Sequence, residues 1–466
     1  MITRIELSGF KTFHDFHLEL APFQVIIGAN ASGKSNLFDA LRLLSYLAEF
    51  DLRTAFQKVR GEAHELFTLL PDGSSVPEMR LAVEFLVNRR IRDSWGAEAD
   101  LKHTRMRYEL HIVRRKDSRG LEHLYISHES LHAIPRKKDA WLHRHVGRYE
   151  EKWLPMRYAG RQAPFISTED KAGVRTIFLH QDGRGGRKTY VAERAERTAL
   201  SGVINTEFPH ALAAREEMRS WRLLQLNPEA LRQPSSMLAT AEVAPNGSNL
   251  PSALARMEAQ DPYALQNVSR DLANLVPGLV RVEVESDEPR KRYIIWAHMQ
   301  DGRRFSSRVL SDGTLRLLAL VTLRNDPQHQ GVLCFEEPEN GVHPSRLRQL
   351  VTLLRGLATD FSDPEQAEEP LRQLLVNTHS PALVKELDVE RELLFAHTVT
   401  RVYPPPKSTQ LRVTRIVPVK KNLQMQLSLG IEREEAAYTL QEVLAYLENA
   451  RPDKAVAQLN GGHWPL

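Results

Sequence analysis

The sequence predicts an α/β fold built around a mainly parallel sheet. From Leu310 onward a helical pattern is followed by an apolar strand (331–335), a helix (344–357), a second apolar strand (374–377) and another helix. Such alternation is typical of parallel strands joined by crossover helices. Near the start of the chain, the unbroken apolar run Phe23–Ile27 has the pattern of a strand buried on both faces. In open sheets of this kind, ligands bind at the carboxyl ends of the strands.

Composition places the chain among globular proteins. It has 466 residues, enough for about two to three domain-sized units, and 42% of them are apolar and 26% charged. No apolar run approaches the ~18 residues of a membrane span, so we expect no membrane association. The N-terminus has the pattern of a first strand rather than a signal peptide. The single cysteine, Cys334, excludes an intrachain disulfide and fits a reducing cytoplasm, where we expect the protein to reside.

Four segments follow one another along the chain. Residues 1–50 contain a strand, a hairpin, the apolar strand, a glycine loop and a helix, which we interpret as the first part of the main fold. Residues 51–230 alternate strand-like runs (79–87, 106–113, 174–180 and 189–191) with basic connections, and they predict an inserted, basic lobe of mixed α/β structure that is rich in strands. Residues 231–400 return to helices and strands that complete the main sheet, and residues 401–466 form a strand–helix extension. No heptad pattern is long enough to predict an extended coiled coil.

The middle segment is basic. From Arg89 to Arg197 there are 25 Lys and Arg against 15 Asp and Glu, whereas the remainder of the chain has 38 against 44. This asymmetry suggests a lobe that faces a polyanion such as nucleic acid. The alternative is a solvated surface whose arginines have carboxylate partners. Within this segment the run Gly183–Lys188 is most simply a hairpin turn, and a contact with a phosphate backbone is the other interpretation.

The first chemical motif lies directly after the apolar strand. Gly28–Ser35 reads GANASGKS and fits G-x-x-x-x-G-K-[ST], with a helical pattern after it. Glycines let successive backbone N–H groups point inward at phosphate oxygens, and the start of a helix adds its dipole. In this arrangement Lys34 would reach the β- and γ-phosphates of ATP, and the Ser35 hydroxyl would ligate Mg²⁺.

A second motif combines an apolar strand with two carboxylates. Val332–Phe335 is followed by Glu336 and Glu337, at the strand end where ligands bind. Glu336 would hold the hydrated Mg²⁺, and Glu337 would act as general base toward the attacking water. Taken alone, an apolar strand that ends in acidic residues is common. Cys334 is interpreted as a small core residue.

Two further motifs are weak individually. Leu310–Thr314 reads LSDGT before an apolar helix; Ser311 is either an ordinary N-cap or part of a helix start that contacts the γ-phosphate of ATP bound to another subunit. Asn377–Pro381 reads NTHSP at the end of an apolar strand, and His379 is either a polar surface residue or a hydrogen-bond donor near the γ-phosphate.

Taken together, in this order, the four motifs resemble those of the ABC-type ATPases of the RecF, SMC and OLD group. In particular, the chain resembles the bacterial RecF-like AAA family ATPases found in anti-phage defence operons. The resemblance covers the first ~50 residues and roughly residues 245–390, including the stretch Asn246–Leu250. It implies an ABC-type P-loop ATPase head, with a mainly parallel sheet, helices and an antiparallel β subdomain, and this head carries the inserted basic lobe.

The resemblance also assigns roles to individual residues. Glu337, His379 and Lys34 would be catalytic, as the catalytic glutamate, the switch histidine and the Walker A lysine. Ser35 and Glu336 would hold Mg²⁺. Residues implied to contact ATP are Lys11, Gly28, Asn30, Ser32, Gly33, Lys34, Ser35 and Asn36, together with the signature residues Ser311 and Gly313 from a second chain. Asn340 and His343 would lie in the D-loop after the Walker B strand.

Three positions depart from the pattern. The signature reads LSDGT where transporters have LSGGQ, which is usual for this group. Glu336 stands where Asp is commoner, and Ala31 replaces a frequent glycine. The sequence does not identify the glutamine of the Q-loop, for which Gln57 is a poor candidate.

These features imply an ATP-dependent switch. Two chains, or a larger homo-oligomer, would clamp ATP head to tail and hydrolyse it, slowly without a partner. We expect the switch to control a separate effector, a nuclease, in anti-phage defence. The chain itself lacks the glutamate-plus-DxD arrangement of a TOPRIM nuclease after His379, and His143–His145 lacks the companion residues of an HNH nuclease. The alternative is a RecF-like ATPase of DNA repair, which would bind DNA through residues 89–197. A transporter motor is disfavoured by the long basic segment and the form of the signature.

Overall fold

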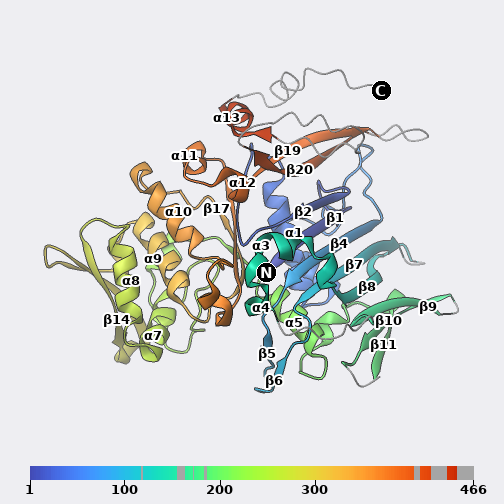
Figure 1. Cartoon of the computed structure of the whole chain (residues 1–466), viewed down its shortest axis with the longest axis horizontal. Coiled ribbons are helices and arrows are strands. Elements are labelled where there is room, and N and C mark those ends of the chain that lie inside the picture. The colour runs from blue at the N-terminus through green and yellow to red at the C-terminus, as the bar shows by residue number, and fades with distance from the viewer. Residues whose placement is uncertain are drawn as a thin grey trace.

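We describe a computed structural model of the chain that covers residues 1–116, 119–154, 163–171, 173–182, 186–402, 410–420 and 438–448. Figure 1 shows the chain in spectral colours, with helices α7–α9 on one side and strands β7–β11 on the other. No helix within these ranges is long and apolar enough to cross a membrane.

A seven-stranded sheet forms the centre of the fold and contains the parallel strands that the sequence predicts. Its strand order is β12-β17-β18-β3-β19-β20-β21, and the five strands from β12 to β19 are parallel to their neighbours. The bounds are β12 (Arg222–Leu224), β17 (Gly331–Glu336), β18 (Arg372–Thr378), β3 (Phe23–Ile27), β19 (Leu393–Val402), β20 (Gln410–Lys420) and β21 (Tyr438–Thr439). The predicted α/β class is therefore confirmed.

Alternation along the central strands divides the interior into two cores. In β17, Val332 and Cys334 belong to one hydrophobic cluster, whereas Leu333 and Phe335 belong to the other. Successive side chains of a strand point to opposite faces, so each face of the sheet has its own cover. Burial raises the pKa of the Cys334 thiol, as expected for a core cysteine.

Helices cover the two faces of this sheet. Helix α1 (Lys34–Leu47) follows β3 and packs in the first core, together with α2 (Leu52–Lys58) and α5 (Pro209–Arg219). The second core is covered by α7 (Leu250–Gln260), α8 (Ala264–Ala273), α9 (Asp312–Asn325) and α10 (Leu347–Arg355). Short helices α6 (Pro228–Arg232), α11 (Pro381–Val384), α12 (Val389–Glu392) and α13 (Leu440–Glu448) lie between or after these elements.

An eight-stranded sheet packs against the other side of α1, and its paired strands are antiparallel. Its order is β11-β10-β9-β8-β7-β4-β1-β2. The strands are β1 (Ile2–Ser8), β2 (Phe16–Glu19), β4 (Glu78–Leu86), β7 (Arg105–Lys116), β8 (Glu122–Ala133), β9 (Ile166–Lys171), β10 (Val174–His180) and β11 (Arg187–Val191). The strands of segment 51–230 thus continue the N-terminal hairpin in one sheet. Strand β12, which also comes from that segment, lies in the central sheet.

Two smaller sheets complete the described fold. One consists of β13 (Ser235–Ser236), β15 (Arg292–Met299), β14 (Leu279–Asp287) and β16 (Arg304–Ser306) beside α7 and α8. The other is the hairpin of β5 (Arg90–Arg92) and β6 (Glu98–Asp100). Residues 183–185 of the predicted Gly183–Lys188 turn and most of segment 401–466 lie outside the described residues.

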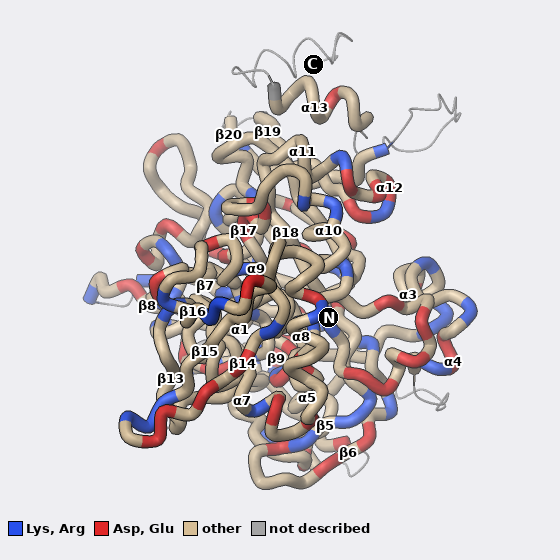
Figure 2. Tube along the Cα trace, turned by 90° about the vertical axis from the view of Figure 1, so that its left-hand side faces the viewer, with Lys and Arg blue, Asp and Glu red and all other residues tan. Residues whose placement is uncertain are grey.

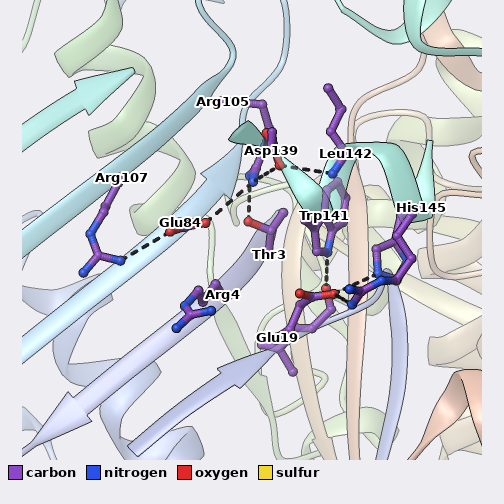
Figure 3. A network of polar contacts seen from close by, with 12 residues as sticks. Thr3, Arg4, Glu19, Glu84, Arg105, Arg107, Asp139, Trp141, Leu142 and His145 are labelled. Atoms are coloured by element: carbon purple, nitrogen blue, oxygen red, sulfur yellow. Dashed lines mark hydrogen bonds and ion pairs between the residues drawn. The ribbon is translucent and has the colours of Figure 1, made fainter. Parts of the chain in front are cut away.

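A polar network attaches the short helix α3 (Ala140–His145) of the middle segment to the rest of the molecule, and the short helix α4 (Glu150–Trp153) follows α3 in the chain. Asp139 caps α3 and pairs with Arg105 of β7 at 2.6 Å, and Arg105 also donates to Thr3 of β1 at 2.6 Å (Figure 3). The Trp141 indole donates to the Leu20 carbonyl at 2.8 Å. Both partners of the Arg105–Asp139 ion pair are buried, so the pair is shielded from solvent.

Candidate nucleotide-binding site

The glycine loop predicted from GANASGKS joins β3 to α1. Gly33 is the residue before the helix and has φ 93°, in the left-handed region that glycine adopts at low cost. Ala31 has φ 62°, an unusual conformation for a residue with a Cβ. Ala31, which the sequence analysis identified as replacing a frequent glycine, therefore has a strained backbone. Such strain is common at functional sites.

Lys34, the first residue of α1, reaches back over the loop. Its ammonium donates to the carbonyls of Gly28 at 2.6 Å and Ala29 at 2.9 Å. Burial lowers the pKa of Lys34 to about 8, and the nearby Glu337 and Glu336 carboxylates oppose part of this shift. The ammonium is thus held at the mouth of the loop by weak acceptors that a phosphate would replace.

The ends of two neighbouring parallel strands supply the acidic side of the site. Glu336 ends β17, and its carboxylate accepts from the Ser35 hydroxyl at 2.8 Å. Asn377 of β18 is its partner in the sheet register, and the Asn377 amide lies 3.4 Å from the same carboxylate oxygen. The hydrogen bond between Ser35 and Glu336 brings together residues 301 positions apart in the sequence.

Glu337 follows in a left-handed conformation, with φ 50°. Its N–H donates to the Asn377 carbonyl at 2.7 Å. One carboxylate oxygen lies 2.9 Å from Nδ1 of His379, and the other accepts from the Asn340 amide at 2.7 Å. The Glu337 carboxylate, which the sequence assigns to the general base, is therefore held between Asn340 and His379, the predicted switch histidine. The Glu337 side chain remains 42% exposed.

These groups line one open cleft of about 1230 Å³. That volume exceeds the roughly 300–1,000 Å³ of a typical small-ligand pocket. Predicted residues that line it are Asn30, Ser32, Gly33, Lys34, Ser35, Asn36, Glu336, Glu337 and His379. Gly28 lies at the base of the loop, where a Cβ would be 2.3 Å from the carbonyl oxygen of Ala396.

One lining residue was missed by the sequence analysis. Gln225 follows β12, which pairs in parallel with β17, so Gln225 lies at the same sheet edge as Glu336 and lines the cleft. Gln57, by contrast, is not among the residues that line the cleft. The signal was faint because β12 has only three residues, Arg222–Leu224, and such a run does not predict a strand.

Lys11 has a different environment from the one expected. Its ammonium pairs with Asp39 of α1 at 2.6 Å and donates to the Arg60 carbonyl at 3.1 Å, and Lys11 is not among the residues that line the cleft. The Arg60 side chain lines the cleft and lies 3.1 Å from Asp39. A cation therefore reaches this side of the cleft from Arg60, which the sequence analysis did not single out.

The predicted signature residues also lie outside the cleft of their own chain. Ser311 caps α9 and accepts from the Thr314 N–H at 3.2 Å, as the simpler of the two interpretations requires. Gly313 packs on the segment after β17, where a Cβ would be 2.3 Å from the Gly341 carbonyl oxygen. Arg232 donates to the Leu310 carbonyl at 3.1 Å and forms an ion pair with Asp312.

Sequence comparison gives the family. Residues 23–385 match the family described as "AAA domain, putative AbiEii toxin, Type IV TA system", a span of more than half of the chain. The chain belongs to this AAA family. The match confirms the resemblance to RecF-like AAA family ATPases, and no curated protein matches the sequence.

Solved structures similar to this AAA protein include heads of SMC proteins. "Crystal structure of the SmcHead bound to the C-winged helix domain of ScpA" is 14% identical, with 89% of this chain and 97% of that chain covered and a TM-score of 0.47. "SMC head domain from Thermotoga maritima" is 13% identical, with 90% of this chain and 99% of that chain covered and a TM-score of 0.36. An Smc head domain from Pyrococcus yayanosii is 12% identical, with 90% of this chain and 97% of that chain covered and a TM-score of 0.40.

The residues of this AAA protein fit ATP and a divalent cation. The Ser32 hydroxyl, in the glycine loop, and the Asn377 side-chain oxygen, beside Glu336, are buried and have no hydrogen-bond partner among the described residues. Buried polar atoms without partners are uncommon, and a ligand bound in the cleft would give these two atoms a partner. The donors around Glu336 are hydroxyl, carboxylate and amide oxygens, the set that Mg²⁺ prefers.

Proposed function

We propose that this chain binds ATP with Mg²⁺, hydrolyses it, and acts as a switch in a head-to-tail homodimer. The observation that carries the proposal is the arrangement at the end of β17. Glu336 meets Ser35 at 2.8 Å and Glu337 meets His379 at 2.9 Å, in one cleft with the glycine loop. Two adjacent carboxylates are thus given different partners, which suits a metal ligand beside a general base.

The residues suggest the following chemistry. Lys34 would leave the loop carbonyls and contact the β- and γ-phosphates, and the loop N–H groups would donate to their oxygens. Ser35 and Glu336 would hold Mg²⁺, which neutralises phosphate charge when bound. Glu337 would accept a proton from water as the water oxygen bonds to the γ-phosphorus, and the bond from that phosphorus to the bridging oxygen would break to leave ADP. His379 and Asn340 would keep the Glu337 carboxylate oriented.

A second chain is proposed because part of the site is missing from the first. Ser311 and Gly313 do not line their own cleft, and the start of α9 is exposed, with Val309 just before it 67% exposed. The cleft is also open and larger than one nucleotide needs. Packing the α9 start of a partner over the γ-phosphate would cover Val309, supply the signature donors and make ATP part of the interface.

The switch is proposed to control a separate effector, a nuclease, in anti-phage defence. The family description, which refers to a toxin of a type IV toxin–antitoxin system, supports such a role. The alternative is a RecF-like ATPase that binds DNA through residues 89–197. Several basic side chains of that segment pair with carboxylates, which favours the first role: Arg89 with Glu368, Arg90 with Asp100, Arg105 with Asp139, Arg107 with Glu6, Arg114 with Glu122, Arg136 with Glu150, Arg144 with Glu19 and Lys188 with Glu207. Figure 2 accordingly shows blue and red segments interspersed around α3, α4, β5 and β6.

The test is the ATPase rate and particle mass of the wild type and Glu337→Gln, each with and without duplex DNA. We expect hydrolysis by the wild type, and an ATP-dependent dimer that persists in Glu337→Gln because hydrolysis is blocked. Glu390→Gln, an exposed change on α12, is the matched control and should behave as wild type. Normal hydrolysis by Glu337→Gln would overturn the catalytic assignment. Strong stimulation by DNA would favour the repair role.

A further inference from the structure

The phosphate loop rests on two strands from near the end of the chain. A Cβ at Gly28 would be 2.3 Å from the Ala396 carbonyl oxygen of β19, and a Cβ at Gly33 would be 2.0 Å from Oγ1 of Thr414 in β20. These separations leave no room for a larger residue at either end of the loop. Both strands lie beyond residue 385, where the family match ends. The loop of this chain therefore packs on strands that lie outside the matched segment.

Thr414 makes more than a packing contact. It is fully buried, and its hydroxyl lies 3.1 Å from the Ser32 carbonyl oxygen and 2.7 Å from the Thr12 hydroxyl. The Asn36 amide donates to the Thr12 hydroxyl at 2.9 Å. A carbonyl only accepts and a hydroxyl has one proton, so Thr414 donates to Ser32 and accepts from Thr12. The result is a relay that runs from Asn36 through both threonines to the loop.

The direction of this relay has a consequence for the loop. In a trans peptide the carbonyl and the following N–H point to opposite sides of the chain. When Thr414 holds the Ser32 carbonyl toward β20, the Gly33 N–H is turned away from β20. Gly33 lines the cleft, so this N–H is available to a phosphate oxygen on the open side of the loop.

We propose that Thr414 is a positioning residue for the phosphate loop, acting through the Ser32–Gly33 peptide. The proposal rests on the ATP site proposed above. It makes the β19–β20 hairpin part of the nucleotide site, and it gives the Thr414 hydroxyl a role distinct from its bulk. Loss of the hydroxyl alone would leave the Ser32 carbonyl and the Thr12 hydroxyl without their buried partner and release the peptide to rotate.

The test compares Thr414→Val, which keeps the shape and removes the hydroxyl, with Thr414→Ser, which keeps the hydroxyl. Both are made in the Glu337→Gln background, and binding of a fluorescent ATP analogue is measured with Mg²⁺. We expect Thr414→Val to raise the Kd about tenfold or more and Thr414→Ser to stay within about threefold of the background. Thr322→Val is the matched control, since Thr322 is also fully buried and its hydroxyl donates to a carbonyl, within α9. It should bind as the background does.

The outcomes distinguish a failure of this inference from a failure of the proposed ATP site on which it rests. If the Glu337→Gln background does not bind the analogue, the proposed ATP site fails. If the background binds, Lys34→Ala does not, and folded Thr414→Val binds as tightly as Thr414→Ser, only the positioning role is wrong. Should Thr414→Val unfold, Thr12→Val interrupts the same relay at a half-buried residue and is expected to weaken binding. Unchanged binding by Thr12→Val would then overturn the relay.

Discussion

The Lys34 ammonium shows how one residue can be both buried and ready to bind. Its present partners are two backbone carbonyls of the loop, which stabilise the charged form less than phosphate oxygens would. Burial consequently lowers its pKa to about 8. Above that pH the free protein increasingly carries a neutral Lys34, and ATP binding must then be coupled to the uptake of a proton from solvent.

We therefore predict that affinity for ATP falls as pH rises through 8. The ratio of neutral to charged amine rises tenfold per pH unit, so for a pKa of about 8 the Kd should rise about 16-fold between pH 8 and pH 9.5. Isothermal titration of Glu337→Gln with ATP and Mg²⁺ from pH 6 to pH 9.5 measures this dependence, and in this variant the decline begins below pH 8 because the Glu337 carboxylate no longer raises the pKa of Lys34. Lys34→Arg, which stays charged throughout this range, is the control and should show a flat profile, although with weaker binding. A flat profile in the parent would contradict the assignment of Lys34.

Prediction from sequence worked at this scale where the chemistry is local. The glycine loop, the acidic pair at the end of β17 and His379 were readable because each motif combines a few adjacent residues with a strand that precedes it. Gln225 was not readable, because its strand has three residues. Thr414 was not readable either, since its partner Ser32 lies 382 positions away and a buried threonine in a strand has no distinguishing pattern.

Among the elements, the contact between α3 and β7 depends on one buried ion pair. Arg105 and Asp139 meet at 2.6 Å and are almost completely shielded from water (Figure 3). Removing one partner leaves the other charged and buried, whereas removing both need cost little. The network is thus a specific anchor for the middle segment, and its two halves should not contribute additively.

We predict that Asp139→Ala lowers the free energy of unfolding by about 3–5 kcal/mol. The double variant Arg105→Met and Asp139→Leu should recover most of this loss, because no unpaired charge remains. Urea denaturation followed by tryptophan fluorescence measures both, and Trp141 lies in α3 itself. An exposed pair, Arg90 and Asp100, provides the comparison: Asp100→Ala should cost less than about 1 kcal/mol. Equal losses at the two sites would contradict the argument from burial.

Glu129 of β8 is a second buried group with a defined structural role. Its carboxylate accepts from the N–H groups of Ala199 and Leu200 at 2.7 and 2.9 Å and from the Tyr108 hydroxyl at 3.1 Å. Burial raises its pKa from 4.5 to about 7, although these hydrogen bonds act in the opposite direction. The folded protein therefore binds this proton more tightly than the unfolded chain does.

The sign of the resulting pH dependence follows from linkage. Between pH 4.5 and pH 7 the carboxyl is protonated when folded and ionised when unfolded, so stability is lost as pH rises through that window. The total loss attributable to Glu129 is about 3 kcal/mol. We predict that Glu129→Gln, which cannot titrate, removes this component: the stability difference between wild type and variant should shrink from pH 5 to pH 8. Denaturation curves at four pH values measure it, and a constant difference would contradict a titrating Glu129.

The sequence predicted which runs form strands, but not which of these strands pair with one another. The strand-like runs 79–87, 106–113, 174–180 and 189–191 correspond to β4, β7, β10 and β11. Their joining with β1 and β2 into one antiparallel sheet was not foreseen, because pairing is decided by cross-strand packing over long sequence separations and not by the periodicity of each run. The parallel central sheet was foreseen, since helices between strands leave few other arrangements.

At the scale of the whole molecule, the predicted signature residues are separated from the rest of the site, although Asp312 between them lines the cleft. The glycine loop, Glu337 and His379 share one cleft, whereas Ser311 and Gly313 lie at the exposed start of α9 and do not line that cleft. The proposed head-to-tail dimer would unite the two halves and create two equivalent composite sites. Each site then requires Lys34 from one chain and Ser311 from the other.

This division predicts complementation between two inactive variants. Lys34→Ala removes the phosphate lysine, and Ser311→Arg blocks the signature face with a bulky cation. Each homodimer should be inactive, because both of its composite sites contain the defect. In an equimolar mixture about half of the dimers are mixed, and one of their two sites combines an intact Lys34 with an intact Ser311, so about a quarter of wild-type ATPase activity should return. Phosphate release from the mixture, compared with each variant alone, measures this.

The control for complementation is a mixture in which both defects fall on the same half of the site. Lys34→Ala mixed with Glu337→Gln leaves no composite site with both residues, so it should stay inactive although mixed dimers form. Recovery in the Lys34→Ala and Ser311→Arg mixture, with none in this control, would require that the two halves come from different chains. Activity of Ser311→Arg alone would show instead that each chain hydrolyses ATP without its neighbour's α9, and the head-to-tail clamp would have to be abandoned.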